Sequence, residues 1–98
     1  MNGITAYCIF INTIIDGKIP AWKGDDGEYL LYRTAREAER DIADDIVEKL
    51  MHVLDGDREL EDALTREDYV EPVILYPDGT FTDIAGTEYR PGKLLDLQ

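Results

Sequence analysis

The sequence predicts an α+β domain, in which a small antiparallel sheet of about four to five strands carries one main amphipathic helix on one face. Three observations support this fold class. A capping signature opens a segment of helical periodicity at residues 34–54, segments rich in β-branched and aromatic residues lie before and after it, and turn signals separate those segments. The expected chain order is strand, strand, strand, helix, short helix, strand, strand.

Three short strands are predicted ahead of the helix. Residues 5–15 are rich in Ile, Thr, Tyr and Phe, which favour a pleated, half-buried surface. The Asp-Gly pair at 16–17 is typical of a two-residue hairpin turn. Residues 18–23 then form a second strand, which we place at an edge because Pro20 cannot donate a ladder hydrogen bond. Residues 28–32 form the third strand.

The main helix is predicted over residues 35–54. Thr34 and Glu37 fit a capping box, in which each side chain accepts a hydrogen bond from the backbone N–H of the other residue. An Asp-Gly pair at 55–56 supplies a left-handed stop. The apolar residues at helical spacing, which we expect to face the sheet, are Ala35, Ala38, Ile42, Ala43, Ile46, Leu50 and Val53.

The remaining elements follow the helix. Residues 57–64 predict a short second helix, and residues 69–76 predict a strand. The Pro-Asp-Gly segment at 77–79 predicts a hairpin turn, because proline fixes φ and glycine adopts the left-handed conformation. Residues 80–84 form the returning strand. Residues 85–98 show no pattern that determines an element.

Length, charge and rare residue types exclude several classes of protein. The 98 residues, expected as a single domain over 1–98, carry 10 Lys+Arg against 22 Asp+Glu, and the net charge of -12 opposes direct binding to nucleic acid or an anionic membrane. Cys8 is the one cysteine and His52 the one histidine, and there is no serine. We therefore expect no disulfide, no metal site, no cofactor and no enzymatic activity. Without a membrane span or secretory signal, the expected location is the cytoplasm.

The acidic residues gather in one region. Residues 34–71 hold 14 acidic and 5 basic side chains. On a helical wheel, four acids lie at roughly 180° to 240° and the apolar residues centre near 30°, so the acids are expected opposite the core. Those four are Glu37, Asp41, Asp44 and Glu48. The full set of candidate partner-binding residues is Glu37, Asp41, Asp44, Asp45, Glu48, Asp55, Asp57, Glu59, Glu61, Asp62 and Trp22.

Carboxylates repeated along a rigid helix can imitate a phosphate backbone. The hypothesis is that this face docks on the basic surface of a nucleic-acid-binding protein and displaces nucleic acid, with fast association that weakens with salt. In size and charge the chain resembles the small acidic inhibitors that phages use against CRISPR or restriction machinery. The simpler alternative is that the acids only keep a small domain soluble.

A second alternative is a homodimeric structural or regulatory module. The strand at 5–15 is apolar on both alternations and would pair edge to edge with a second copy, with Trp22 as an anchor. Over residues 5–76, the element order alone is similar to that of the small domain of HicB-type antitoxins, so the dimeric module is antitoxin-like at most and no function is carried over from that family. The glycine-rich segment expected between strands and helix in that family is missing here.

Overall fold

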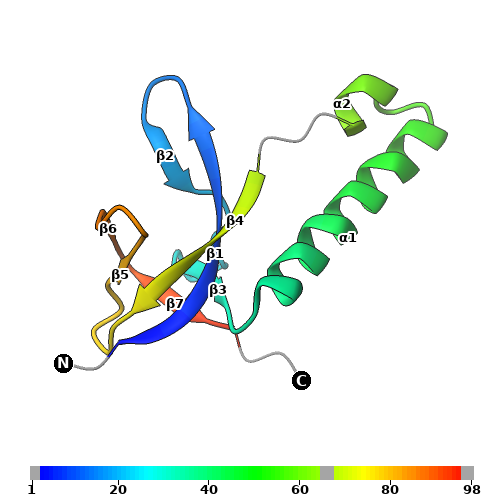
Figure 1. Cartoon of the computed structure of the whole chain (residues 1–98). Helices are drawn as coiled ribbons and strands as arrows, with labels where there is room; N and C mark the ends of the chain where they lie inside the picture. The colour runs from blue at the N-terminus through cyan, green and yellow to red at the C-terminus, as the bar shows by residue number, and fades with distance from the viewer. Residues whose placement is uncertain (1–2, 65–67, 96–98) are drawn as a thin grey trace.

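A seven-stranded sheet organises the described part of the chain, residues 3–64 and 68–95 of a computed structural model (Figure 1). One long helix lies beside the sheet and a short helix follows it. The elements are β1 (Ile4–Thr13), β2 (Gly17–Pro20), β3 (Tyr29–Tyr32), α1 (Ala35–Leu54), α2 (Leu60–Leu64), β4 (Asp68–Leu75), β5 (Phe81–Thr82), β6 (Glu88–Tyr89) and β7 (Gly92–Leu94). The predicted α+β class is confirmed, and so is the chain order as far as β5.

The sheet is mixed, although an antiparallel one was predicted. Its strand order is β6-β5-β4-β1-β3-β7, with β2 also paired to β1. β7 runs parallel to β3, so that Tyr29 lies opposite Gly92 and Leu31 opposite Leu94. Both β6 and β7 come from the C-terminal segment without a predicted element. They are two and three residues long, too short to show an alternating pattern, and they raise the strand count above the predicted four to five.

β1 is the centre of the sheet and not an edge. On one side it pairs with β4 from Ile4 opposite Leu75 to Ile11 opposite Asp68. On the other side it pairs with β3 and, nearer its end, with β2. The predicted edge-to-edge pairing of this strand with a second copy is therefore wrong, because the chain's own strands occupy most of both sides. β1 is apolar on both alternations because both of its faces are buried.

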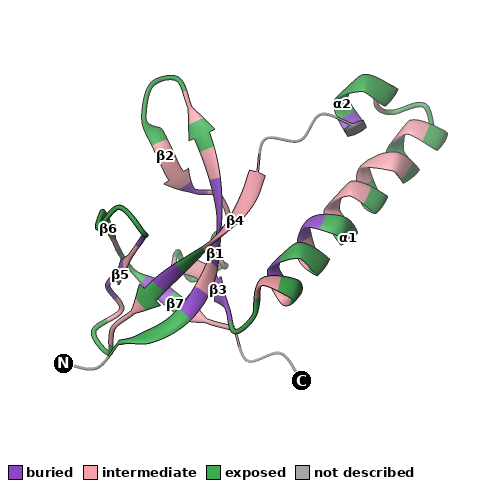
Figure 2. Ribbon diagram, viewed as in Figure 1, coloured by how far each residue is buried: buried purple, intermediate pink, exposed green. Residues whose placement is uncertain are grey.

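The two faces of the sheet carry separate cores, which Figure 2 shows as buried segments at the strands and at the start of α1. The first core contains Ala6, Cys8, Phe10, Leu31, Val73 and Phe81. The second core, on the other face of β1, contains Ile9, Tyr32, Ala38 and Ile42, the last two from α1. Cys8 is thus a small buried apolar residue, as predicted.

The turns follow from glycine conformations. The β1–β2 loop has three residues, Ile14 to Asp16, closed by Gly17 at φ +68°, so the expected two-residue turn is wrong. That loop leaves Ile14 fully exposed. The turn at 77–79 is confirmed, because the Gly79 N–H donates to the Tyr76 carbonyl at 3.0 Å and Gly79 has φ +90°.

Both ends of α1 match the predicted signals in most respects. The Thr34 hydroxyl accepts the Glu37 backbone N–H at 3.1 Å. The reciprocal half of the capping box is not completed by Glu37 Oε2, which is buried without a hydrogen-bond partner. At the other end Gly56 has φ +82° and its N–H donates to the Val53 carbonyl at 3.1 Å, which ends the helix where it was predicted.

The molecule is elongated for its size. Its Cα radius of gyration is 14.7 Å and its principal extents are 51 × 36 × 23 Å, whereas about 13 Å is typical of a folded chain of this length. Figure 1 shows the reason: the C-terminal half of α1 and α2 extend beyond the sheet, and so does the β1–β2 hairpin. Much of the predicted acidic region therefore projects into solvent.

Candidate protein-binding surface

Seven of the predicted site residues form one exposed region, which we call the acidic surface. It covers the outer half of α1, the turn after it and α2. Its members are Asp44, Glu48, Asp55, Asp57, Glu59, Glu61 and Asp62, all of which are exposed. The turn adds a shallow hollow of about 390 Å³, lined by Asp57, Arg58, Glu59, Asp62 and the Gly56 backbone. The backbone stop at Gly56 lets the chain reverse, so that carboxylates of the turn and of α2 lie near one another.

The other predicted acids of α1 do not stand opposite the core. Ala38 and Ile42 are the fully buried positions of the helix, and they centre roughly 70° from the predicted direction, on the side of Asp41 and Asp45. Asp41 and Asp45 are therefore half-buried. The expectation of a uniform acidic ladder on the solvent side is wrong for these two residues and for half-buried Glu37.

A hydrogen bond from Tyr32 explains why α1 is rotated about its own axis relative to the predicted orientation. Its side chain is buried, and its hydroxyl donates to Asp41 Oδ2 at 2.7 Å. A buried hydroxyl needs a partner, and the small Ala38 lets α1 approach the sheet closely enough to supply one. Burial, followed by the bond to Asp41, raises the pKa of Tyr32 well above its ordinary value. Asp41 thus stabilises the contact between helix and sheet, and its carboxylate is committed within the chain.

Two further predicted residues, Asp45 and Trp22, have partners inside the molecule. Asp45 pairs with Lys49 one turn on, with Oδ2 and Nζ 3.0 Å apart. Trp22 is half-buried and packs against the second core. The structure therefore separates the eleven predicted residues into two groups. One group is the acidic surface, and the other contains Glu37, Asp41, Asp45 and Trp22, which lie against the protein itself.

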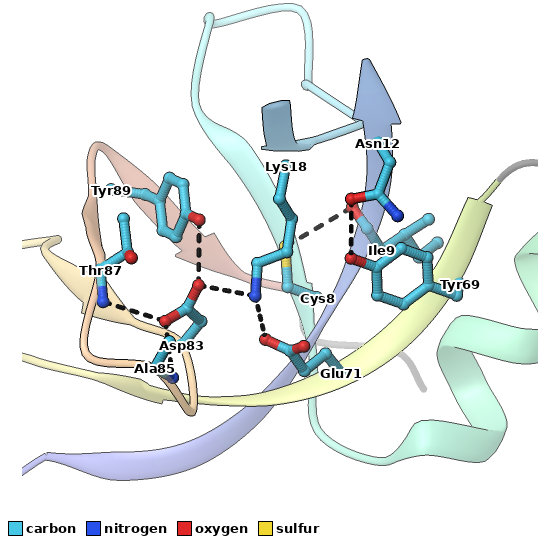
Figure 3. Close-up of polar contacts among 10 residues, drawn as sticks. All are labelled: Cys8, Ile9, Asn12, Lys18, Tyr69, Glu71, Asp83, Ala85, Thr87 and Tyr89. Carbon is cyan, nitrogen blue, oxygen red and sulfur yellow. Dashed lines mark hydrogen bonds and ion pairs between the residues drawn. The ribbon is translucent and has the colours of Figure 1, made fainter. Parts of the chain in front are cut away.

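A polar cluster that the sequence did not predict lies beside the first core (Figure 3). Lys18 Nζ lies 2.7 Å from both Glu71 Oε2 and Asp83 Oδ2. Asp83 also accepts hydrogen bonds from the Tyr89 hydroxyl at 3.0 Å and from the backbone N–H groups of Thr87 and Ala85 at 2.9 and 3.0 Å. The Lys18 ammonium lies 4.8 Å from the centre of the Phe10 ring.

The contacts within this cluster stabilise the charged forms of Lys18 and Asp83. Burial of Asp83 works to raise its pKa, but the hydrogen bonds from Lys18, Thr87 and Tyr89 outweigh burial and lower it. Burial lowers the Lys18 pKa less than its two carboxylate partners raise it. Both Asp83 oxygens already accept hydrogen bonds, so this carboxylate is poorly suited to act as a general base. The cluster ties β2 to β4 and to the segment after β5.

Cys8 lies next to this cluster, but its thiol is inert in this setting. Burial and then the charge of Glu71 raise the pKa of Cys8 to about 12. The thiolate is the nucleophilic and metal-binding form, and it is scarce at neutral pH with that pKa. Within residues 3–64 and 68–95, no group of three or more His, Cys, Asp or Glu side chains is arranged to hold a metal ion.

The last candidate feature is apolar. An exposed line of side chains on α1, which we call the apolar stripe, consists of Ala43, Val47, Met51 and Leu54. The prediction that Ala43 faces the sheet is therefore wrong. The expected apolar face is otherwise correct, since Ala35, Ile46, Leu50 and Val53 are half-buried.

No helix in the described part of the chain has the length and apolar character needed to cross a membrane. Comparison with known proteins finds no matching family model, curated relative or solved structure.

Proposed function

We propose that this chain is a small acidic protein-binding module, whose acidic surface docks on the basic surface of a nucleic-acid-binding protein and keeps nucleic acid out. The observation that carries the proposal is the concentration of seven exposed carboxylates on the projecting part of α1, its turn and α2. A net charge of -12 adds a long-range field that steers a cationic partner towards the chain.

The spacing of the carboxylates supports a phosphate-like role. Asp44 and Glu48 are one turn apart on α1, about 6 Å along the helix axis. Asp55, Asp57 and Glu59 then continue the negative charge around the turn. A groove that binds nucleic acid offers Lys and Arg side chains in rows, and rows of carboxylates on a rigid element match them. Inhibitors of CRISPR or restriction complexes are the class of protein that this chemistry fits.

Charge reversal on the acidic surface tests the proposal. Changing Asp44, Glu48 and Asp62 to Lys is expected to weaken capture of a basic partner from a host extract at least about 100-fold, since close charge pairs across interfaces contribute about 1.5 kcal/mol or more each. Asp41 is left unchanged because Tyr32 depends on it. The measurement is immobilised capture followed by titration with salt, which should release the partner.

A matched variant separates position from net charge. Asp16, Asp25 and Glu88 are also exposed acids, but they lie away from α1 and α2. Reversing these three to Lys changes the net charge by the same amount, and capture should persist. Equal loss in both variants, or full capture by the first variant with its fold intact by circular dichroism, would contradict the proposal.

A further inference from the structure

Residues 3–64 and 68–95 leave much of the apolar stripe on α1 uncovered. Val47, Met51 and Leu54 are 55%, 58% and 85% exposed. They lie roughly 160° around the helix from the buried direction of Ala38 and Ile42, so no part of the sheet can reach them. Large apolar side chains gathered on one face of a small protein are typical of an interaction surface.

Two arginines extend the stripe towards the start of the helix. Arg36 and Arg40 are exposed and share the direction of Val47 to within roughly 20°. Together with the apolar stripe they recur at intervals of four, three, four, four and three residues, which is the spacing of a helix–helix seam. The seam is about 27 Å long. It is basic at its first end and apolar over the rest, and the acidic turn follows its last residue.

We propose that a second copy of this chain covers this seam, through antiparallel pairing of the two α1 helices about a two-fold axis near Val47. With Val47 opposite its own counterpart, Arg40 lies opposite Leu54 and beside Asp55. Arg36 then lies opposite position 58 of the partner, where the half-buried Arg58 stands between the exposed carboxylates of Asp57 and Glu59. The basic end of each copy meets the acidic end of the other.

Charge complementarity selects both the occupant and the orientation. Parallel pairing would set Arg36 and Arg40 against the same arginines of the other copy, and acid against acid, which is destabilising. A uniformly basic partner would be repelled at the first end of the seam and a uniformly acidic one at the last. A second copy in antiparallel orientation supplies the required signs in the required order, as a two-fold interface demands.

This dimer does not depend on the proposed function, and it leaves part of the acidic surface open. Because the two-fold axis is perpendicular to both helices, the side of α1 that carries Asp44 and Glu48 points in the same direction in both copies. Asp44 and Glu48 of both copies therefore lie on one face of the dimer. A partner that binds this face would therefore contact Asp44 and Glu48 of both copies.

Light scattering of the purified full chain at micromolar concentration tests the dimer. The expected mass is twice the 11.2 kDa of one chain. Changing Val47 and Met51 to Glu should give the single-chain mass while the helical circular dichroism signal stays, because both side chains are exposed. The matched control changes Ile14 and Ile15 to Glu, which are exposed on the β1–β2 loop, and should leave the dimer intact.

Charge swapping and cross-linking test the orientation. Changing Arg36 and Arg40 to Glu should weaken the dimer, and adding Asp55→Arg and Asp57→Arg should restore it. A mixture of R40C and L54C chains should cross-link to each other on oxidation, faster than either alone. Cys8 does not compete because it is buried.

Three results would overturn the inference. These are a single-chain mass for the unchanged protein, a dimer that survives the Val47 and Met51 changes, and preferential cross-linking of R40C chains among themselves. The reversal of Asp44, Glu48 and Asp62 that tests the proposed function should leave the mass doubled. Failure of partner capture and failure of the dimer are therefore distinguishable.

Discussion

Replacing Lys18 with Met is expected to lower the free energy of unfolding by about 3–5 kcal/mol, because the change leaves the buried carboxylate of Asp83 and the half-buried carboxylate of Glu71 without their cation. The Asp83 side chain is 1% exposed and that of Glu71 is 13% exposed, and Lys18 lies 2.7 Å from both. Domains of this size are stable by only about 5–15 kcal/mol. The measurement is urea unfolding at neutral pH, followed by circular dichroism.

Lys49 provides the matched control for this change. Its pair with Asp45 lies on the surface, with side chains 34% and 38% exposed. Such a pair contributes about 0.3–0.5 kcal/mol, so Lys49→Met should be nearly neutral. Equal effects of the two lysine substitutions would show that the Lys18 cluster is not the buried network described above.

The pH dependence of the Lys18 effect has a defined sign. The folded state lowers the pKa of Asp83, so its stabilising contribution is present above the unfolded pKa, about 3.9. That contribution is lost as pH falls through the lower folded value. Once Asp83 is protonated it no longer needs a cation. The difference in stability between the unchanged chain and Lys18→Met should therefore shrink in acid, and a difference that grows in acid would contradict this assignment.

Truncating Phe81 to Ala should cost a similar amount, about 3–5 kcal/mol, because it opens a cavity in the first core. Phe81 is fully buried, stacks on Tyr89 with ring centres 5.4 Å apart and meets the edge of Tyr29 at 6.1 Å. The backbone of Gly92 also lies against this ring, so closely that a methyl group at position 92 would fall 2.5 Å from Phe81 Cδ1. The measurement is again the unfolding midpoint in urea.

Ile84 controls for the loss of an apolar side chain in the same part of the chain. It is 76% exposed, and truncation to Ala at such a site is expected to change stability by less than about 0.5 kcal/mol. A large loss at Ile84, or a small loss at Phe81, would mean that the segment after β4 does not close the first core.

Elements set by local rules were predictable from the sequence. The start of α1 at Thr34 and its stop at Gly56 depend on neighbouring residues, and so does the turn that Gly79 completes. The same is true of Cys8, whose apolar neighbours in a β-rich segment already placed it in a core. The helix ends and the turn depend on interactions between residues close in sequence, whereas the core around Cys8 also contains the distant residues Leu31 and Phe81.

Two of the contacts that were missed join distant parts of the chain, and a third joins Tyr32 to Asp41, nine positions on. Lys18 and Asp83 are 65 positions apart, and nothing near either residue indicates the other. β7 pairs with β3 in parallel, which no local turn can encode. The rotation of α1 depends on the hydrogen bond from Tyr32 to Asp41. Helical periodicity does not predict this bond, because it assigns Tyr32 to an apolar strand and Asp41 to the polar face of the helix. The position of the acidic residues in the sequence therefore located the candidate site, but the sequence did not predict which of their side chains point into solvent.

Competition with nucleic acid tests the central proposal most directly. The captured partner is bound to a fluorescently labelled duplex, and the anisotropy of the duplex is followed while this chain is added. If the chain displaces nucleic acid, the anisotropy should fall to that of free duplex, and the D44K/E48K/D62K variant should leave it unchanged. A ternary complex, in which partner, duplex and chain remain together, would show that the chain does not displace nucleic acid.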